Sequence, residues 1–184
     1  AGDTNGVADV FIKDTLTNET RLVSRDSNGN VLTTDSTQHA MSADSRYIAF
    51  RSGSQFGFDH QIYLKDTVTG ELSLMSADIN GNSISSLNYN PAISADGRYV
   101  TFATEDDRQV YRKDTKTGKL DLVSSNKQGL AANGDTVLFN ILPTTQSEQT
   151  ISADGRFVTF VSLATNLVSG VSNGEYNIFL KIIL

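Results

Sequence analysis

The chain has 184 residues and a formal net charge of −6. This length suits one globular domain, and the negative charge argues against nucleic acid as a partner, because that affinity depends on Lys and Arg neutralising phosphates. The absence of cysteine excludes disulfides, thiol catalysis and zinc–thiolate sites. No stretch approaches the roughly 20 apolar residues of a membrane-spanning helix, so no membrane span is expected.

The first loop, residues 3–9, carries oxygen-bearing side chains at Asp3, Asn5 and Asp9. Alternating oxygen donors around a tight turn form part of a calcium-site pattern, so these three residues are the candidate metal ligands and calcium is the candidate cofactor. The alternative is an Asx-turn loop that binds no ion. No distal bidentate Glu follows at the required offset, and the matching loop at residues 171–177 lacks both aspartates.

Two sequence blocks then alternate along the chain. One is an apolar-aromatic run that ends in Lys, and it begins at Val10, Ile62, Val110 and Ile178. The other contains Ser-Ala-Asp followed by Gly or Ser, Arg, an aromatic residue and further apolar residues, and it begins at Met41, Ile93 and Ile151. Alternation of residue types within the blocks predicts β-strands, and their recurrence predicts a repeat architecture.

In chain order the predicted strands read C-D, A-B-C-D, A-B-C-D, A-B-C, in the pieces 1–24, 38–76, 90–124 and 150–184. Residues 125–149 form an insertion outside this pattern. Four-stranded antiparallel units repeated around a centre make a β-propeller. We therefore expect one all-β propeller domain over residues 1–184, with about three blades plus one strand, which is an incomplete ring or one completed by association.

The blocks Ile-Ser-Ala-Asp-Gly-Arg-Tyr-Val-Thr-Phe and Val-Tyr-x-Lys-Asp-x-x-Thr-Gly resemble the TolB-like β-propeller repeat, the WD40-like group of bacterial exported proteins. The resemblance covers residues 1–124 and 150–184. It implies the propeller fold and a secreted, periplasmic or cell-surface location. Functions within that family vary too widely for one to be transferred.

The Asp-Gly pairs after strand A predict two-residue hairpins with positive φ at both central positions. Asp44, Asp96 and Asp154 recur once per blade at these turns, so we expect them to be structural rather than catalytic. The lysines that end strand C are expected to stay solvated or to pair with carboxylates; they are Lys13, Lys65, Lys113 and Lys181.

Length variation between the repeats falls in the D-to-A and B-to-C loops, which antiparallel order places on one face. Recognition is expected on this face, because variable loops on a rigid scaffold commonly carry binding. Candidate contact residues are the apolar side chains of the insertion and of the last strand, which either pack on their own blade or cover a partner. They are Val137, Leu138, Phe139, Ile141, Leu142, Ile182, Ile183 and Leu184.

No nucleophile elbow, phosphate loop or dinucleotide fingerprint is present. The sequence therefore favours a non-catalytic binding or assembly module of an exported bacterial protein, with a protein partner or a second copy of the chain as its ligand. The alternative is an accessory propeller of a peptidase-type hydrolase whose catalytic domain lies outside this chain.

Overall fold

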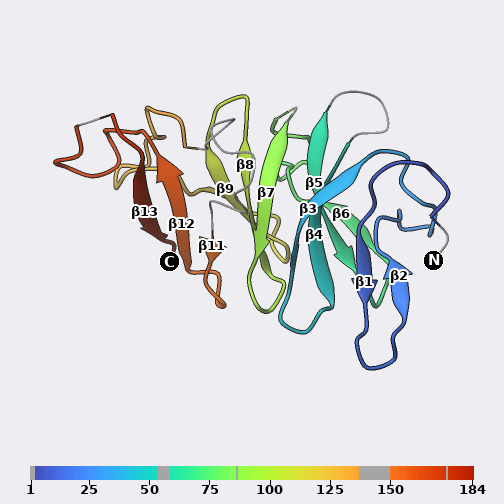
Figure 1. Cartoon of the computed structure of the whole chain (residues 1–184). Coiled ribbons are helices and arrows are strands. Elements are labelled where there is room, and N and C mark those ends of the chain that lie inside the picture. Colours follow the sequence, from blue (N-terminus) through green and yellow to red (C-terminus); the bar gives the residue numbers. More distant parts are fainter. Residues whose placement is uncertain (1–2, 54–58, 86, 137–149, 173) are drawn as a thin grey trace.

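The computed structural model describes residues 3–53, 59–85, 87–136, 150–172 and 174–184. Within these ranges the secondary structure is all β, and no helix is long and apolar enough to cross a membrane. The strands form four antiparallel sheets, which follow one another across the molecule with the first and last sheets at opposite ends of the row (Figure 1).

Each sheet is one blade, and its strands are neighbours in sequence order. Blade 1 contains β1 (Phe11–Lys13) and β2 (Thr20–Leu22). Blade 2 contains β3 (Ser36–Met41), β4 (Tyr47–Gly53), β5 (His60–Asp66) and β6 (Leu72–Leu74). Blade 3 contains β7 (Asn88–Ile93), β8 (Tyr99–Thr104), β9 (Val110–Asp114) and β10 (Leu120–Leu122). Blade 4 contains β11 (Thr150–Ile151), β12 (Phe157–Ser162) and β13 (Asn177–Ile182). The predicted strand order is confirmed.

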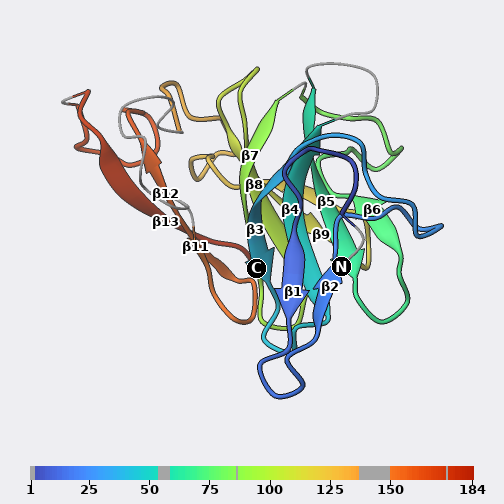
Figure 2. The ribbon, with the colours of Figure 1, turned by 45° about the vertical axis from the view of Figure 1, so that its right-hand side comes forward.

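The hydrophobic core lies between the blades. Three clusters of buried side chains each join two successive blades; for example, Ile62 and Leu64 of blade 2 pack with Phe102 of blade 3. Strands with apolar residues on both faces need cover on both sides, and the neighbouring blades supply it. In the view of Figure 2, the strands of blade 4 lie at one side of the molecule, and the other three sheets overlap.

The hairpins between strands A and B differ from the predicted type. In blade 3 the N–H of Gly97 donates to the carbonyl of Ser94 at 3.0 Å, and Gly97 has a φ of 73° while Asp96 does not have a positive φ. The turn is therefore a type I turn followed by one left-handed residue. The carboxylate of Asp96 accepts bonds from the Ser94 hydroxyl (2.7 Å) and the Arg98 N–H (3.0 Å), which confirms a structural role for this repeated aspartate.

The strands at the start of blades 2 and 3 begin at Ser36 and Asn88, two residues before the predicted pieces. Each contains a register shift next to a residue with positive φ, Gln38 at 44° or Asn90 at 52°. A bulge interrupts the alternation of side chains between the two faces, so the pattern in the sequence hides the first residues of the strand.

The insertion also begins later than the sequence suggested. In the loops after β2 and β6, the carboxylates of Asp26 and Asp78 each accept two backbone N–H bonds. Asn126 accepts the same two bonds in the loop after β10, and an isolated bridge joins Ser125 to Ala131 as in the other two loops. Residues 125–132 therefore repeat the D-to-A loop of blades 1 and 2.

The strand C lysines were predicted to stay solvated or to pair with carboxylates, but in blades 2 to 4 they bond mainly to backbone carbonyls. The ammonium of Lys65 donates to the carbonyls of Arg25 (2.9 Å), Asp26 (3.1 Å) and Gly70 (2.6 Å). Lys113 and Lys181 likewise reach the segment that follows strand D of the preceding blade. Burial lowers the pKa of Lys65 and of Lys113. These lysines link one blade to the next, whereas Lys13 is exposed.

Candidate functional site

Two of the three candidate calcium ligands are engaged within the protein. The side-chain amide of Asn5 donates to Asp9 (3.0 Å) and to the carbonyl of Leu32 (2.7 Å). The hydroxyl of Ser24 donates to the other oxygen of Asp9. Asp3 is exposed. Among the described residues, no three or more His, Cys, Asp or Glu side chains form a group that could hold a metal ion.

The other blades explain the bonds of Asp9 and Asn5. In blade 3, Gln109 takes the position of Asp9: its oxygen accepts from the Ser124 hydroxyl (2.6 Å), and its amide donates to the carbonyl of Ala132 (3.1 Å). In blade 1, Asp9 supplies the acceptor and Asn5 supplies the donor. Together, Asp9 and Asn5 make the two hydrogen bonds that Gln109 makes alone. This arrangement needs no ion, and calcium binding here stays a prediction.

The candidate contact residues fall into two groups. Val137, Leu138, Phe139, Ile141 and Leu142 lie outside the described residues. At the end of the chain, Ile182 and Leu184 are exposed, whereas Ile183 packs against the cluster between blades 3 and 4.

The side of blade 4 that faces away from blade 3 is apolar and exposed. Strand pairing places Ile178 at the position of Ile62 in blade 2 and Val110 in blade 3. Ile62 and Val110 are 0% and 1% exposed, against 79% for Ile178. Leu180 is 59% exposed, and the residue at its position in blade 2, Leu64, is 6% exposed. Other blades bury this side against their next neighbour.

Blade 1 leaves the opposite side of the repeat uncovered. Strand pairing puts Phe11 at the position of Tyr63 and Lys13 at the position of Lys65. Phe11 is 40% exposed, and Lys13 is exposed although Lys65 is buried. The two ends of the row thus present complementary halves of the contact that joins successive blades elsewhere.

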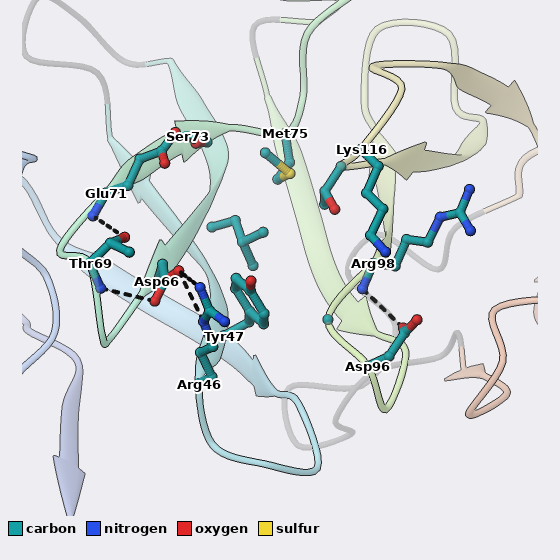
Figure 3. A pocket seen from close by; sticks show the side chains of 13 residues that line it. Arg46, Tyr47, Asp66, Thr69, Glu71, Ser73, Met75, Asp96, Arg98 and Lys116 are labelled. Atoms are coloured by element: carbon teal, nitrogen blue, oxygen red, sulfur yellow. Dashed lines mark hydrogen bonds and ion pairs between the residues drawn. The ribbon is translucent and has the colours of Figure 1, made fainter.

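A cavity of about 350 Å³ lies between blades 2 and 3 on the face that carries the A-B and C-D turns. This is the face opposite to the variable loops. Figure 3 shows Tyr47 in the middle of the cavity, with Asp66 on one side and Asp96 and Arg98 on the other. Leu64, Ser73 and Glu71 also line it. We call this cavity the open groove.

The matching groove between blades 3 and 4 is occupied by a side chain. Strand pairing places Arg112 at the position of Leu64 and Asp121 at that of Ser73. Arg112 donates to Asp121 at 2.6 Å and to the carbonyl of Gly155 at 2.6 Å. Its guanidinium lies over the ring of Tyr99, 4.4 Å from the centroid. We call this the filled groove.

Ion pairs border both grooves. Arg46 bonds Asp66 at 2.8 Å and lowers the pKa of that carboxyl to about 2, and Arg98 does the same for Asp114. In the filled groove, burial raises the pKa of Asp121, but hydrogen bonds from Lys119 and Arg112 outweigh it, so that its pKa is lowered. All three carboxylates are therefore charged near neutral pH.

The open groove lies on the face opposite to the variable loops, where the sequence had predicted recognition, so it was not among the predicted sites. A signal was present in the repeat itself: Leu64 and Ser73 stand where the next blade has Arg112 and Asp121. Its meaning depends on knowing that these residues face the next blade.

Comparison with solved structures supports the fold. The chain is similar to TolB from Acinetobacter baumannii, with 20% identity, a TM-score of 0.52, and coverage of 95% of this chain and 35% of that chain. For the putative TolB from Agrobacterium tumefaciens, these values are 16%, 0.58, 97% and 54%. For an oligogalacturonate lyase in complex with manganese, they are 15%, 0.60, 100% and 44%. No protein-family model and no curated protein matches the chain.

The chain thus spans about a third to about half of the length of these structures. At such low identity the likeness concerns the fold alone. The chain has the fold of a partial β-propeller, similar to that of TolB and of other propeller proteins.

Proposed function

We propose that this chain is a non-catalytic binding and assembly module of an exported bacterial protein, and that it assembles through the open sides of its first and last blades. The observation that carries the proposal is the exposure of Ile178 (79%) at a position where blades 2 and 3 have buried residues. The resemblance of the repeat to exported propeller proteins supports the location.

The partner on this side is a β-sheet of the same kind as the blades. Within the chain, the same position always meets a strand pair of the following blade. Burial of each Ile or Leu side chain on the face would contribute about 1.5–3 kcal/mol to association. In addition, the sheet order leaves the outer edge of β13 without a paired strand in the described part of the chain. An unpaired edge is a template for another strand.

The mass of the protein in solution, measured over a range of concentrations, tests the proposal. We expect the chain to self-associate, because a second copy can offer the exposed side of blade 1 to that of blade 4. The double variant Ile178→Lys/Leu180→Lys should shift the chain toward a monomer. As a control, Val68→Lys changes an equally exposed apolar residue (74%) on a turn away from both sides.

A chain that stays monomeric at all concentrations would contradict the proposal. So would a double variant that associates as strongly as the wild type and the control.

A further inference from the structure

We propose that the open groove between blades 2 and 3 binds the guanidinium group of an arginine side chain that belongs to a partner protein or peptide. The inference goes beyond the assembly proposed above and uses a different surface. It rests on the comparison of the open groove with the filled groove, in which the protein holds a guanidinium of its own.

The filled groove shows what a guanidinium contacts in this setting. Arg112 bonds the carboxylate of Asp121 and the carbonyl of Gly155, and it lies over the ring of Tyr99. Its side chain is only 7% exposed. A carboxylate, a carbonyl and an aromatic face are the partners that a guanidinium prefers, because they combine charge, donor geometry and cation–π attraction.

The open groove keeps the aromatic ring and the turn of this arrangement. Tyr47 stands at the position of Tyr99, and Gly97 at that of Gly155. Each ring packs so closely on the glycine of the next blade that an added Cβ would lie 2.2 Å from a ring carbon of Tyr47 and 2.1 Å from one of Tyr99. The two grooves therefore have the same shape on this side.

The open groove lacks the guanidinium itself. Two arginines lie over Tyr99, Arg98 at 4.8 Å and Arg112 at 4.4 Å. In the described part of the chain, only Arg46 lies over Tyr47, at 4.9 Å. Leu64 replaces Arg112 and is too short to reach the turn, so the space is open as a cavity of about 350 Å³.

A carboxylate is nevertheless retained. Ser73 takes the position that Asp121 has in the filled groove. The Ser73 hydroxyl donates to the carboxylate of Glu71 at 3.0 Å and so holds that carboxylate beside this position. In the filled groove, the position of Glu71 is taken by Lys119, which pairs with Asp121 at 2.8 Å. Within the described residues Glu71 forms no ion pair, so its charge is available to a ligand.

The other charged groups of the open groove are matched. Arg46 pairs with Asp66 at 2.8 Å, and Arg98 pairs with Asp114 at 2.8 Å. Asp96 and Lys116 also line the groove. Burial raises the pKa of Asp96, but hydrogen bonds from the Ser94 hydroxyl and the Arg98 N–H, together with the charge of Lys116, outweigh it, so that the pKa is lowered. The remaining charge is the carboxylate of Glu71, which selects a cation, and the Tyr47 ring favours a flat one.

Titration of the whole chain with N-acetyl-arginine N-methylamide, followed by amide NMR shifts, tests this inference. We expect weak, saturable shifts at Gly97 and at residues 69–73. The citrulline analogue, which has a neutral urea of nearly the same shape, should produce none, and the lysine analogue should bind more weakly. Equal binding of the citrulline analogue would overturn the inference, as would the absence of shifts in the groove.

A second measurement introduces the Arg and Asp side chains of the filled groove into the open groove. The double variant Leu64→Arg/Ser73→Asp copies the filled groove and should weaken binding at least about tenfold. As a control, Leu16→Arg adds an arginine at an exposed position (96%) in the turn of blade 1, which does not line the groove, and should leave binding unchanged. Binding that persists in the variant Leu64→Arg/Ser73→Asp would overturn the inference, whether or not the chain self-associates.

The reverse exchange must also supply the carboxylate that Glu71 provides, so the triple variant Arg112→Leu/Lys119→Glu/Asp121→Ser should create a second binding site with shifts near Gly155. If this variant does not fold, the variant Leu64→Arg/Ser73→Asp and the citrulline analogue still decide the question, because neither removes a buried ion pair.

Discussion

The open groove and the filled groove are built from corresponding strands, turns and aromatic residues of successive blades, but a side chain of the protein occupies only the filled groove. In the filled groove, Arg112 and Asp121 satisfy each other in a site where the Arg112 side chain is 7% exposed. In the open groove, the shorter side chains of Leu64 and Ser73 leave a cavity, and the carboxylate of Glu71 lies beside this cavity. Two residues of a strand pair thus decide whether a blade interface is only structural or also able to bind.

The comparison teaches that departures from the repeat matter most where they face a neighbouring blade. Loops of unequal length are visible in the sequence as insertions. The change from Arg112 to Leu64 keeps the length of the repeat, and it alters the surface all the same. Tests of the two grooves should therefore give unequal results at equivalent positions.

The largest expected difference in stability between the two grooves comes from removing Arg112, the side chain that occupies the filled groove. Arg112→Leu leaves Asp121 buried with only Lys119 as a partner and frees the carbonyl of Gly155. Breaking one side of a buried ion pair costs about 3 kcal/mol of stability. The midpoint of chemical denaturation should fall accordingly, whereas Arg46→Leu in the open groove should cost about 1 kcal/mol. Equal losses would show that the two grooves do not differ in energy.

The turn glycines test the aromatic contact that both grooves share. Gly97→Ala introduces a Cβ that meets the Tyr47 ring at 2.2 Å, at a φ of 73°. We expect a loss of about 2–3 kcal/mol, of which about 1 kcal/mol comes from the backbone conformation. Gly29→Ala is the matched control, since Gly29 has a φ of 86° and no neighbour within 4 Å of the added Cβ. Thermal unfolding of the two variants separates the contact from the backbone term.

The lysine links test how the blades beside the open groove are held together. Lys113 donates to the carbonyls of Ala77 (2.6 Å) and Asp78 (3.1 Å) of the preceding blade. Lys113→Met should cost about 1–2 kcal/mol, because those carbonyls lose their donor. Lys13→Met should change the denaturation midpoint little, because Lys13 is exposed. A similar loss at both positions would contradict the linking role.

The smallest expected effect is the response to acid. Asp66 borders the open groove and Asp114 the filled one, and each has a pKa lowered to about 2 by its arginine. A lowered pKa stabilises the fold above the unfolded value of about 4, and this gain is lost as the pH falls toward 2. Each pair contributes about 1 kcal/mol, since the arginines are partly exposed. In Asp66→Asn and Asp114→Asn, the stability difference from wild type should vanish over this range.

The strand order was predictable because each blade repeats the same alternation of apolar residues and the same turn residues. Asn18, at a φ of 62°, takes the position of Gly70 in its turn, because Asn tolerates the left-handed conformation that Gly adopts there. The start of β3 was not predictable, since a bulge breaks the alternation that the prediction used. The bonds of Asp9 and Asn5 were missed because their equivalent in blade 3 is a single residue, Gln109.

The all-β repeat, the composition of the blades and the structural role of the repeated aspartates could be predicted, because they follow from local periodicity and turn chemistry. Which side chains face the next blade became visible only from the packing of the blades. Because of that packing, Lys65 links two blades, Ile178 is exposed and Leu64 lines a cavity. Each of these roles depends on contacts between segments about 30–40 residues apart or on the absence of such contacts, and no local pattern encodes them.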